Sequence, residues 1–405
     1  MSSPTTDDVP PSSLFLFYLN TFATLLVANM FVYGLVILTR ALTESDGFTG
    51  MVFMAGYLPA LLFGAYAGTL LDRVSRLMVV HIAQTVYMGT AFLLAGLLYV
   101  GVLDADRAWI LIGIAFINGM ALTFLIPGRL SLLANLVPEG DAGRATIILN
   151  VLIIIGFGLA PLVTGQIKAN VDWDGLFIAI GLLYMCAWSI LFFVKPRPYE
   201  KRETGSAFAA FREGLGFAVR TPLIRDMLIF EMIVMGVIGP ILVLMPQYAQ
   251  TTLGLSESGR GAFLSALGAG LFVGGIAARA LHSRRRRGWL MLGAGVLMGL
   301  FVAYLITDPR VAPSAIKLAL SGAFGGLLGA MIPAALQQAA PDFIRGRVMS
   351  LYGMIFQVMP GFVGLGSGLL ADVVGVGAAV QYVGLGIFVL TILAAIFLRH
   401  VRSYD

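Results

Sequence analysis

The chain is poor in cysteine, histidine and charged residues. Its 405 residues include one cysteine, Cys186, and three histidines, and only 12% are Asp, Glu, Lys or Arg. A single cysteine excludes an internal disulfide framework and a thiolate metal site. The histidines lie far apart, at His81, His282 and His400, without the short spacing of metal-binding pairs. We expect no metal, and the absence of a G-x4-G-K-S/T loop predicts no nucleotide cofactor.

Apolar residues are abundant instead. They make up 59% of the sequence, and its charged fraction of 12% is about half of the roughly 25% found in soluble domains. We therefore expect the lipid bilayer to be the partner of this chain, and we do not expect nucleic acid. A helix that spans a bilayer needs about 20 apolar residues, and the sequence contains twelve such runs. We predict an all-α membrane protein with twelve transmembrane helices at residues 14–39, 49–71, 77–103, 108–129, 144–167, 175–194, 223–248, 257–281, 288–307, 314–338, 345–371 and 376–398.

Positively charged residues sort to one side of this predicted bundle. If both chain ends are cytoplasmic, six of the 26 lysines and arginines lie outside and the other twenty lie inside, as the positive-inside rule requires. The first thirteen residues contain no base and do not resemble a signal peptide. We predict a multi-pass protein of the bacterial inner membrane with both termini in the cytoplasm.

One polar spacer is longer than the others and divides the chain. It covers residues 195–222, between an N-terminal half at 1–194 and a C-terminal half at 223–405. The spacer is either an amphipathic helix on the inner membrane face or a plain solvated linker. Apolar residues at helical spacing favour the helix, namely Phe208, Phe211, Leu215 and Val219.

The two halves repeat part of their sequence. Pro138 and Arg144 precede the fifth run, and Pro341 and Arg347 precede the eleventh with the same spacing, at an offset of 203 residues. Parallel repetition of this kind predicts two pseudo-symmetric six-helix halves. A weaker repeat, at an offset of 206, relates Gly64 and Gly68 of the second run to Gly270 and Gly274 of the eighth.

A short motif of acidic and basic residues joins the second and third runs. It contains Gly68, Asp72, Arg73 and Arg76. The motif resembles the signature that members of the major facilitator superfamily carry between helices 2 and 3, with Ser75 in place of the usual glycine. Taken alone, the same residues also suit a solvated loop that follows the positive-inside rule.

The resemblance implies a major facilitator fold and a gating role for this motif. In the family, the inner end of helix 2 faces the inner start of helix 11, where the helix dipole favours a carboxylate. Asp72 and Arg76 are therefore expected to latch the halves together when the cavity faces outward. Gly68 and Arg73 complete the gating motif, and Arg129, at the inner end of the fourth run, is expected to join its network.

The fifth run carries a second motif, around Pro161 and Gly165. It is similar to an exporter motif of the same family, although Ala160 and Thr164 replace two of its glycines. We expect Pro161 to bend the helix and Gly165 to admit a close neighbour; an ordinary proline kink is the alternative. Around Arg347 the sequence resembles the branch that holds macrolide exporters and the enterobactin exporter.

Few polar residues lie within the predicted spans, where they are costly and usually face a cavity. Asn29 and Tyr33 are one turn apart in the first run, Asn118 is in the fourth and Gln357 is in the eleventh. Each suits a bond between helices as well as a contact with substrate. With Met235, whose flexible thioether suits varied ligands, these residues predict a substrate cavity that is mostly apolar.

Glu231 is the one acid well inside a predicted span. It lies ~12 Å from the start of its helix, and Met227 and Met235 flank it at helical spacing. Removal from water favours the protonated form of such a carboxyl, which suits a proton carrier or a counter-ion for a cationic substrate; a structural carboxylate is the alternative. Drug–proton antiporters of the family often carry an arginine where this chain has Ala115.

These features together predict a secondary active exporter that works by alternating access. We expect its substrate to be an amphipathic or apolar small molecule, such as a drug-like compound or a siderophore, exchanged for a proton. We expect no enzymatic activity and no cofactor, and we expect the chain to act as a monomer. A lysophospholipid flippase of the same fold is the alternative among transporters, and a non-transporting membrane sensor or scaffold is the alternative of another class.

Overall fold

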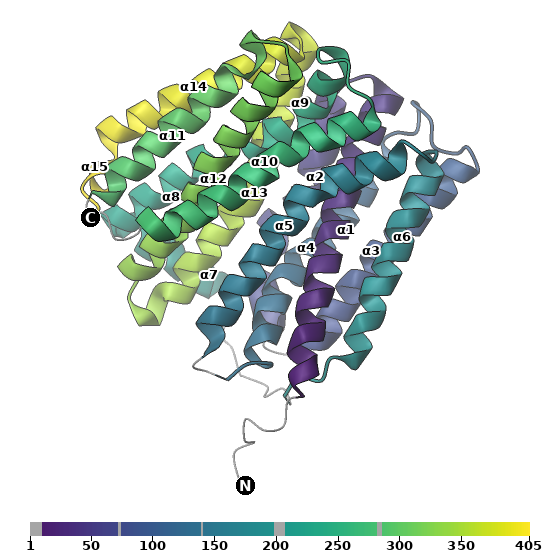
Figure 1. Ribbon diagram of the computed structural model, residues 1–405. Coiled ribbons are helices and arrows are strands. Elements are labelled where there is room, and N and C mark those ends of the chain that lie inside the picture. Colours follow the sequence, from purple (N-terminus) through teal and green to yellow (C-terminus); the bar gives the residue numbers. More distant parts are fainter. Residues whose placement is uncertain (1–9, 72–73, 139–140, 198–206, 282–285) are drawn as a thin grey trace.

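The computed structural model describes residues 10–71, 74–138, 141–197, 207–281 and 286–405. The regular elements of these residues are all helices (Figure 1). Twelve helical segments are long and apolar enough to cross a membrane. The predicted all-α membrane protein with twelve transmembrane helices is confirmed. A helix is the favoured form in lipid because it satisfies its own backbone groups.

Six of the spans precede the long spacer. Side chains from all six meet in one buried core, to which α1 contributes Phe17, α4 Leu111 and α6 Phe177. The helices end within five residues of the predicted runs, at α1 Pro11–Thr43, α2 Asp46–Leu71, α3 Arg76–Tyr99, α4 Ile110–Ala134, α5 Ala142–Lys168 and α6 Trp173–Ile190, which continues into the 3-10 helix η3 Leu191–Phe193.

The other six spans follow the spacer, and one of them is broken. Residues 223–248 were predicted as one helix, but a turn at Gly236 and Val237 separates α8 from α9. Pro240 explains the break, because it cannot donate a hydrogen bond to the carbonyl of Gly236 four residues earlier. The elements are α8 Pro222–Met235, α9 Ile238–Thr251, α10 Glu257–Leu281, α11 Arg287–Ala303, η4 Leu305–Thr307, α12 Val311–Ala339, α13 Asp342–Val374, α14 Val376–Phe397 and α15 Arg399–Arg402.

A helix also forms within the long spacer, as α7 Ala207–Arg220. It packs against the start of α13, where Glu213 forms an ion pair with Arg347 and the rings of Phe217 and Phe343 meet edge to face. It also contacts α2 of the other half. Leu215, on the predicted apolar face, is exposed, so α7 combines a protein-facing side with an exposed apolar side.

Two pairs of helices form most of the contact between the halves. We call them the α2/α13 seam and the α5/α10 seam (Figure 1). Glycines line both seams, so that Gly50 meets the backbone of Leu365 and Gly158 meets Gly268. Only residues without a side chain allow two helix backbones to approach so closely.

The two seams repeat one another. Gly165 of α5 contacts the backbone of Glu257 at the start of α10, and Gly368 of α13 contacts that of Asp46 at the start of α2. Gly165 and Gly368 are 203 residues apart, which is the offset of the sequence repeat.

The structure corrects the weaker repeat. Gly119 of α4 contacts Gly56 of α2 in the way that Gly322 of α12 contacts Leu267 of α10. Leu267 lies 211 residues after Gly56, so the offset of 206 between the second and eighth spans is wrong. The physical reason is that glycines in these helices serve different neighbours, and their spacing alone does not identify equivalent positions.

In both seams, the close backbone contacts lie toward one end of each helix. Because the spans are even in number, the chain enters and leaves on the same side, which we call the terminal side; the other is the far side. The contacts between the halves in which a glycine meets backbone fall in the far-side portion of each seam helix, whereas Gly64, nearer the terminal side of α2, has open space around it. The far-side contacts lie at residues 46–57 of α2, 158–165 of α5, 257–268 of α10 and 361–372 of α13.

Candidate functional site

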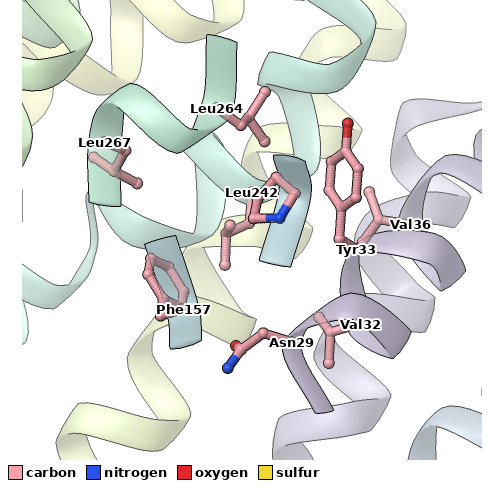
Figure 2. A pocket seen from close by; sticks show the side chains of 9 residues that line it. Asn29, Val32, Tyr33, Val36, Phe157, Leu242, Leu264 and Leu267 are labelled. Carbon is pink, nitrogen blue, oxygen red and sulfur yellow. The ribbon is translucent and has the colours of Figure 1, made fainter. Parts of the chain in front are cut away.

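An apolar pocket lies between the two halves (Figure 2). The N-terminal half contributes side chains from α1 and α5, and the C-terminal half contributes side chains from α9 and α10. The only polar side chains among the described residues that line this pocket are those of Asn29 and Tyr33. The pocket is lined by Asn29, Val32, Tyr33, Val36, Phe157, Pro161, Leu242, Leu264 and Leu267.

The two polar residues of this pocket differ in their surroundings. Asn29 donates a 2.7 Å hydrogen bond to the carbonyl of Leu25 one turn earlier. The Tyr33 hydroxyl lies within electrostatic range of Arg260 and Glu257 of α10. Two of the predicted substrate-binding residues therefore line one pocket, beside the predicted export-motif residue Pro161.

A second pocket lies within the N-terminal half and shares Val32 and Val36 with the first. Asn118 lines it and donates 2.8 Å and 3.1 Å hydrogen bonds to Thr90 and to the carbonyl of Ile114. The Asn118 side-chain oxygen is buried and has no hydrogen-bond partner among the described residues. This oxygen is an acceptor that a ligand with a donor could use.

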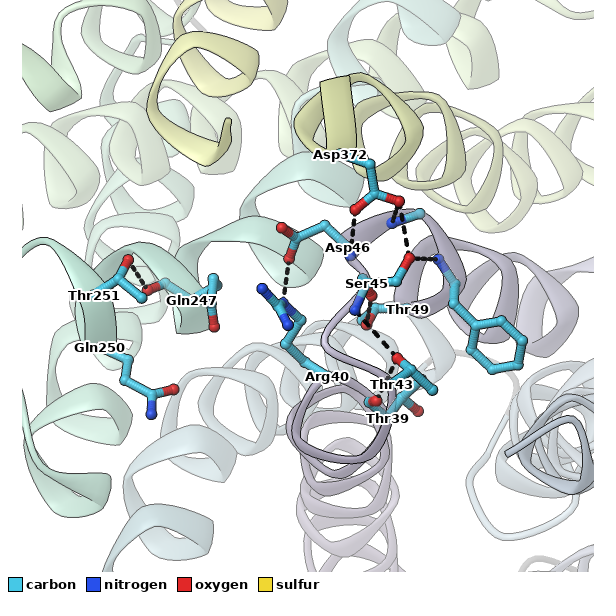
Figure 3. A network of polar contacts seen from close by, with 12 residues as sticks. Thr39, Arg40, Thr43, Ser45, Asp46, Thr49, Gln247, Gln250, Thr251 and Asp372 are labelled. Atoms are coloured by element: carbon cyan, nitrogen blue, oxygen red, sulfur yellow. Dashed lines mark hydrogen bonds and ion pairs between the residues drawn. The ribbon is translucent and has the colours of Figure 1, made fainter. Parts of the chain in front are cut away.

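The far side of the α2/α13 seam is closed by a polar network (Figure 3). The Asp372 carboxylate accepts hydrogen bonds from the Ser45 hydroxyl at 2.8 Å and from the backbone N–H groups of Asp46 and Gly47 at 2.8 Å and 3.0 Å. These N–H groups begin α2, where the helix dipole favours negative charge. Arg40 in turn forms a 2.9 Å ion pair with Asp46. A carboxylate of one half thus caps a helix of the other.

The far side of the α5/α10 seam is closed mainly by packing. Gly165 and Pro161 meet the first turns of α10 at Glu257 and Gly261. The buried Arg260 pairs with Glu257 and donates a 2.8 Å hydrogen bond to Gln250, all within the C-terminal half. The close approach expected at Gly165 therefore lies at this seam, beside Pro161.

Glu231 is fully buried in the C-terminal half and lines neither described pocket. Met235 packs in the same core, and Tyr352 of α13 lies within electrostatic range of the carboxyl. Neither carboxyl oxygen has a hydrogen-bond partner among the described residues. Burial of an ionised carboxylate without partners is very costly, so this packing suits the protonated form. Gln357, also on α13, donates a 3.4 Å hydrogen bond to the carbonyl of Gly353.

The gating motif is described in part. Asp72 and Arg73 lie outside the described residues, and Gly68 is in the last turns of α2. Arg76 begins α3 and donates hydrogen bonds to the Ser131 carbonyl and to Asn135, at the end of α4.

Arg129, the remaining member of the predicted gating network, points into the interior of the N-terminal half. It donates a 3.0 Å hydrogen bond to Asn20 of α1. Asp72, the acid of the predicted gating network, lies outside the described residues.

Sequence reasoning missed several of these residues. Asp372, Tyr352 and Phe157 were not singled out from the sequence. Asp372 carried one usable signal, since it follows Gly368 by four residues and so lies on the glycine face of its helix.

Comparison with known proteins agrees with this architecture. Residues 17–316 match the family model of the Major Facilitator Superfamily. The chain is 23% identical over 366 residues to the multidrug efflux pump Tap of Mycolicibacterium fortuitum, and the match covers 88% of each chain.

Solved structures with the same fold include three transporters. The nucleoside transporter NupG aligns with a TM-score of 0.79 at 13% identity, over 96% of this chain and 99% of that one. A D-xylose–proton symporter aligns with a TM-score of 0.78 at 14% identity, over 96% and 99%. An inward-facing bacterial homologue of the human lysosomal transporter Spinster aligns with a TM-score of 0.73 at 13% identity, over 100% and 98%. At these identities the likeness concerns the fold alone.

Proposed function

Because this chain belongs to the Major Facilitator Superfamily, we propose that it is a secondary active exporter of amphipathic or apolar small molecules. The observation that carries the proposal is the pocket between the halves, whose side chains are apolar apart from Asn29 and Tyr33. Such a lining suits an apolar body with one or two polar groups. The efflux pump named among its relatives supports export, as does the motif around Pro161.

The proposed cycle is alternating access. The predicted topology puts twenty of the 26 bases on the terminal side, which supports a cytoplasmic location for that side. With its far side closed, the molecule would then be in the inward-facing state. Outward opening requires the Asp372 network and the α5/α10 contacts to separate. In that state Asp72 and Arg76 would approach the start of α13 and latch the cytoplasmic side.

The proposed coupling ion is a proton, carried by Glu231. Its carboxyl is fully buried without a described hydrogen-bond partner. It lies within electrostatic range of Tyr352 of α13, a helix whose other end belongs to the far-side closure. Movement of α13 would change the surroundings of Glu231 and favour release of its proton. This links proton exchange to the opening of the α2/α13 seam.

A transport assay tests the proposal. The chain is expressed in a bacterial host that lacks its own efflux pumps and is loaded with a panel of fluorescent cationic, neutral and siderophore-like compounds. We expect energy-dependent efflux of at least one amphipathic compound, abolished by a protonophore and impaired by Tyr33→Ala. Efflux of no compound, together with uptake of a polar nutrient, would contradict export. Translocation of fluorescent lysophospholipid in proteoliposomes would instead identify a flippase.

A further inference from the structure

A cluster of buried polar side chains lies inside the N-terminal half, where α1, α3, α4 and α6 meet. Asn20 of α1 donates a 2.6 Å hydrogen bond to the carbonyl of Ala187 in α6 and accepts a 3.1 Å bond from Gln84 of α3. The same Asn20 oxygen accepts the 3.0 Å bond from Arg129 of α4. The Asn20 amide therefore connects four helices, and its donors and its acceptor oxygen all take part in hydrogen bonds.

Arg129 brings a full positive charge into this cluster. Its side chain is 2% exposed, and its Nε and one terminal nitrogen have no hydrogen-bond partner among the described residues. A buried guanidinium normally has a carboxylate partner, because the loss of water is otherwise not offset. Arg260, the other deeply buried arginine of the described chain, has such a partner in Glu257.

The groups around Arg129 are rich in donors. Tyr184 of α6 lies in electrostatic range of the guanidinium, and its ring stacks on that of Tyr87 at a centroid distance of 5.2 Å. The hydroxyls of Tyr184 and of Thr24, one turn after Asn20 on α1, are buried without a described partner. The Tyr184 hydroxyl and a cation without a described carboxylate partner thus lie in one cluster, in which the amide oxygens of Asn20 and Gln84 already accept hydrogen bonds.

We propose that this cluster binds a small inorganic anion of halide type, such as chloride. An anion supplies the missing negative charge, and a spherical acceptor accepts hydrogen bonds from the guanidinium and the hydroxyls without demanding a fixed geometry. Water would fill some of the same hydrogen bonds but would leave the charge uncompensated. The full burial of Arg129, Tyr184 and Thr24 favours a single-atom ion over a larger organic anion.

The anion site lies within one half and apart from the pocket between the halves. It would fix the relative positions of four helices of the N-terminal half in both states of a transport cycle. Its occupancy is therefore measurable without any transported substrate, and it does not depend on the proposed export function.

Thermal unfolding of the purified full-length protein tests the site. The chain is held in detergent or nanodiscs in sodium gluconate and titrated with chloride or bromide at constant ionic strength. We expect a saturable rise in Tm of a few degrees, because a ligand that binds only the folded state stabilises it. Arg129→Gln should abolish the rise. Arg260→Gln, which removes a buried arginine that has a carboxylate partner, should retain it.

Two milder variants keep the test decisive if Arg129→Gln does not fold. Tyr184→Phe and Thr24→Val each remove one hydroxyl with little change in shape, and each should move the chloride midpoint to higher concentration. A bromide anomalous peak beside Arg129 in crystals would locate the ion. A wild-type Tm that does not respond to halides would overturn the proposal, as would a response that survives Arg129→Gln. If Asp72 is instead the carboxylate partner of Arg129, the Tm of the wild type will not respond to halides and the Tm of Asp72→Asn will. That result would also overturn the proposal.

Discussion

The carboxylate of Asp372, at the end of α13, accepts a 2.8 Å hydrogen bond from the backbone N–H of Asp46, at the start of α2. The two residues belong to different halves and are 326 positions apart in sequence. Ser45 and Gly47 bond to the same carboxylate, so one side chain caps the first turn of a helix in the opposite half. The free energy of far-side closure therefore includes charge-assisted hydrogen bonds as well as packing.

The first prediction concerns this cap. Asp372→Asn keeps the size of the side chain and removes its charge, and a hydrogen bond to a charged group contributes about 1.5–3 kcal/mol. A loss of ~1.4 kcal/mol corresponds to a tenfold change in an equilibrium constant. We expect about tenfold faster labelling of a cysteine at the buried pocket residue Val36 by an impermeant thiol reagent added from the far side, on a Cys186→Ser background.

A matched control exists for this experiment. Asp308 is an acid outside the helices, between η4 and α12, and its pair with Arg310 lowers the pKa of its carboxyl. Asp308→Asn removes a charge from the same side of the protein without touching a seam, so it should leave the labelling of the Val36→Cys reporter unchanged. Equal labelling rates in Asp372→Asn and wild type would show that packing alone closes the far side.

The second prediction concerns glycine packing. A Cβ at Gly268 would meet the backbone of Gly158 across the α5/α10 seam, and a backbone cannot move aside as a side chain can. Gly268→Ala should therefore hold the far side open, with rapid labelling at Val36→Cys and slow transport. Gly293→Ala in α11, where open space surrounds the new methyl group, should behave as wild type. Normal far-side closure in Gly268→Ala would mean that α5 and α10 accommodate the added methyl group without a cost in free energy.

The third prediction concerns Glu231. Glu231→Gln is nearly isosteric and cannot carry a proton, so we expect a folded protein that binds substrate but does not couple its export to a proton gradient. Substrate-induced proton movement in proteoliposomes should vanish, and export driven by an imposed pH gradient should fall to background. Glu44→Gln, at an exposed helix end, is the control. Persistence of gradient-driven export in Glu231→Gln would assign Glu231 a structural role.

The fourth prediction concerns orientation. Ser403, near the C-terminus, and Ser256, before α10, are exposed on opposite sides of the bundle. Cysteines introduced there in place of serine, on the Cys186→Ser background, should differ in intact cells. Ser256→Cys should react with an impermeant thiol reagent, and Ser403→Cys should react only after the membrane is permeabilised. The reverse pattern would place both termini outside and invert the predicted topology.

The sequence alone predicts the spans and the division into halves because both rest on long apolar runs and a 203-residue repeat. The break at Gly236 was missed, since hydropathy does not register the hydrogen bond that Pro240 removes. The partners of Asp372 and Arg129 could not be predicted either. Each makes its contacts with helices distant in sequence, and the direction of a side chain within a bundle depends on how the helices rotate against one another.

The site residues divide on the same physical basis. Asn29 and Tyr33 share a pocket because they are one turn apart on one helix, a relation that sequence spacing expresses directly. Glu231 and Gln357 were grouped with them as polar residues within spans, yet neither lines the described pockets. The polarity of a residue indicates that it needs a partner, whereas the location of that partner depends on the tertiary fold.

The two seams are built on one repeated plan but are not equally strong. Position 169, which lies 203 residues before Asp372, is an alanine, so the α5/α10 seam lacks a carboxylate that caps the helix opposite. Separating that seam exposes glycine backbone and apolar surface, whereas separating α2 from α13 also breaks three hydrogen bonds to a carboxylate. On the far side, α5 and α10 would then separate first, and the two halves would rotate relative to one another about an axis at the α2/α13 seam.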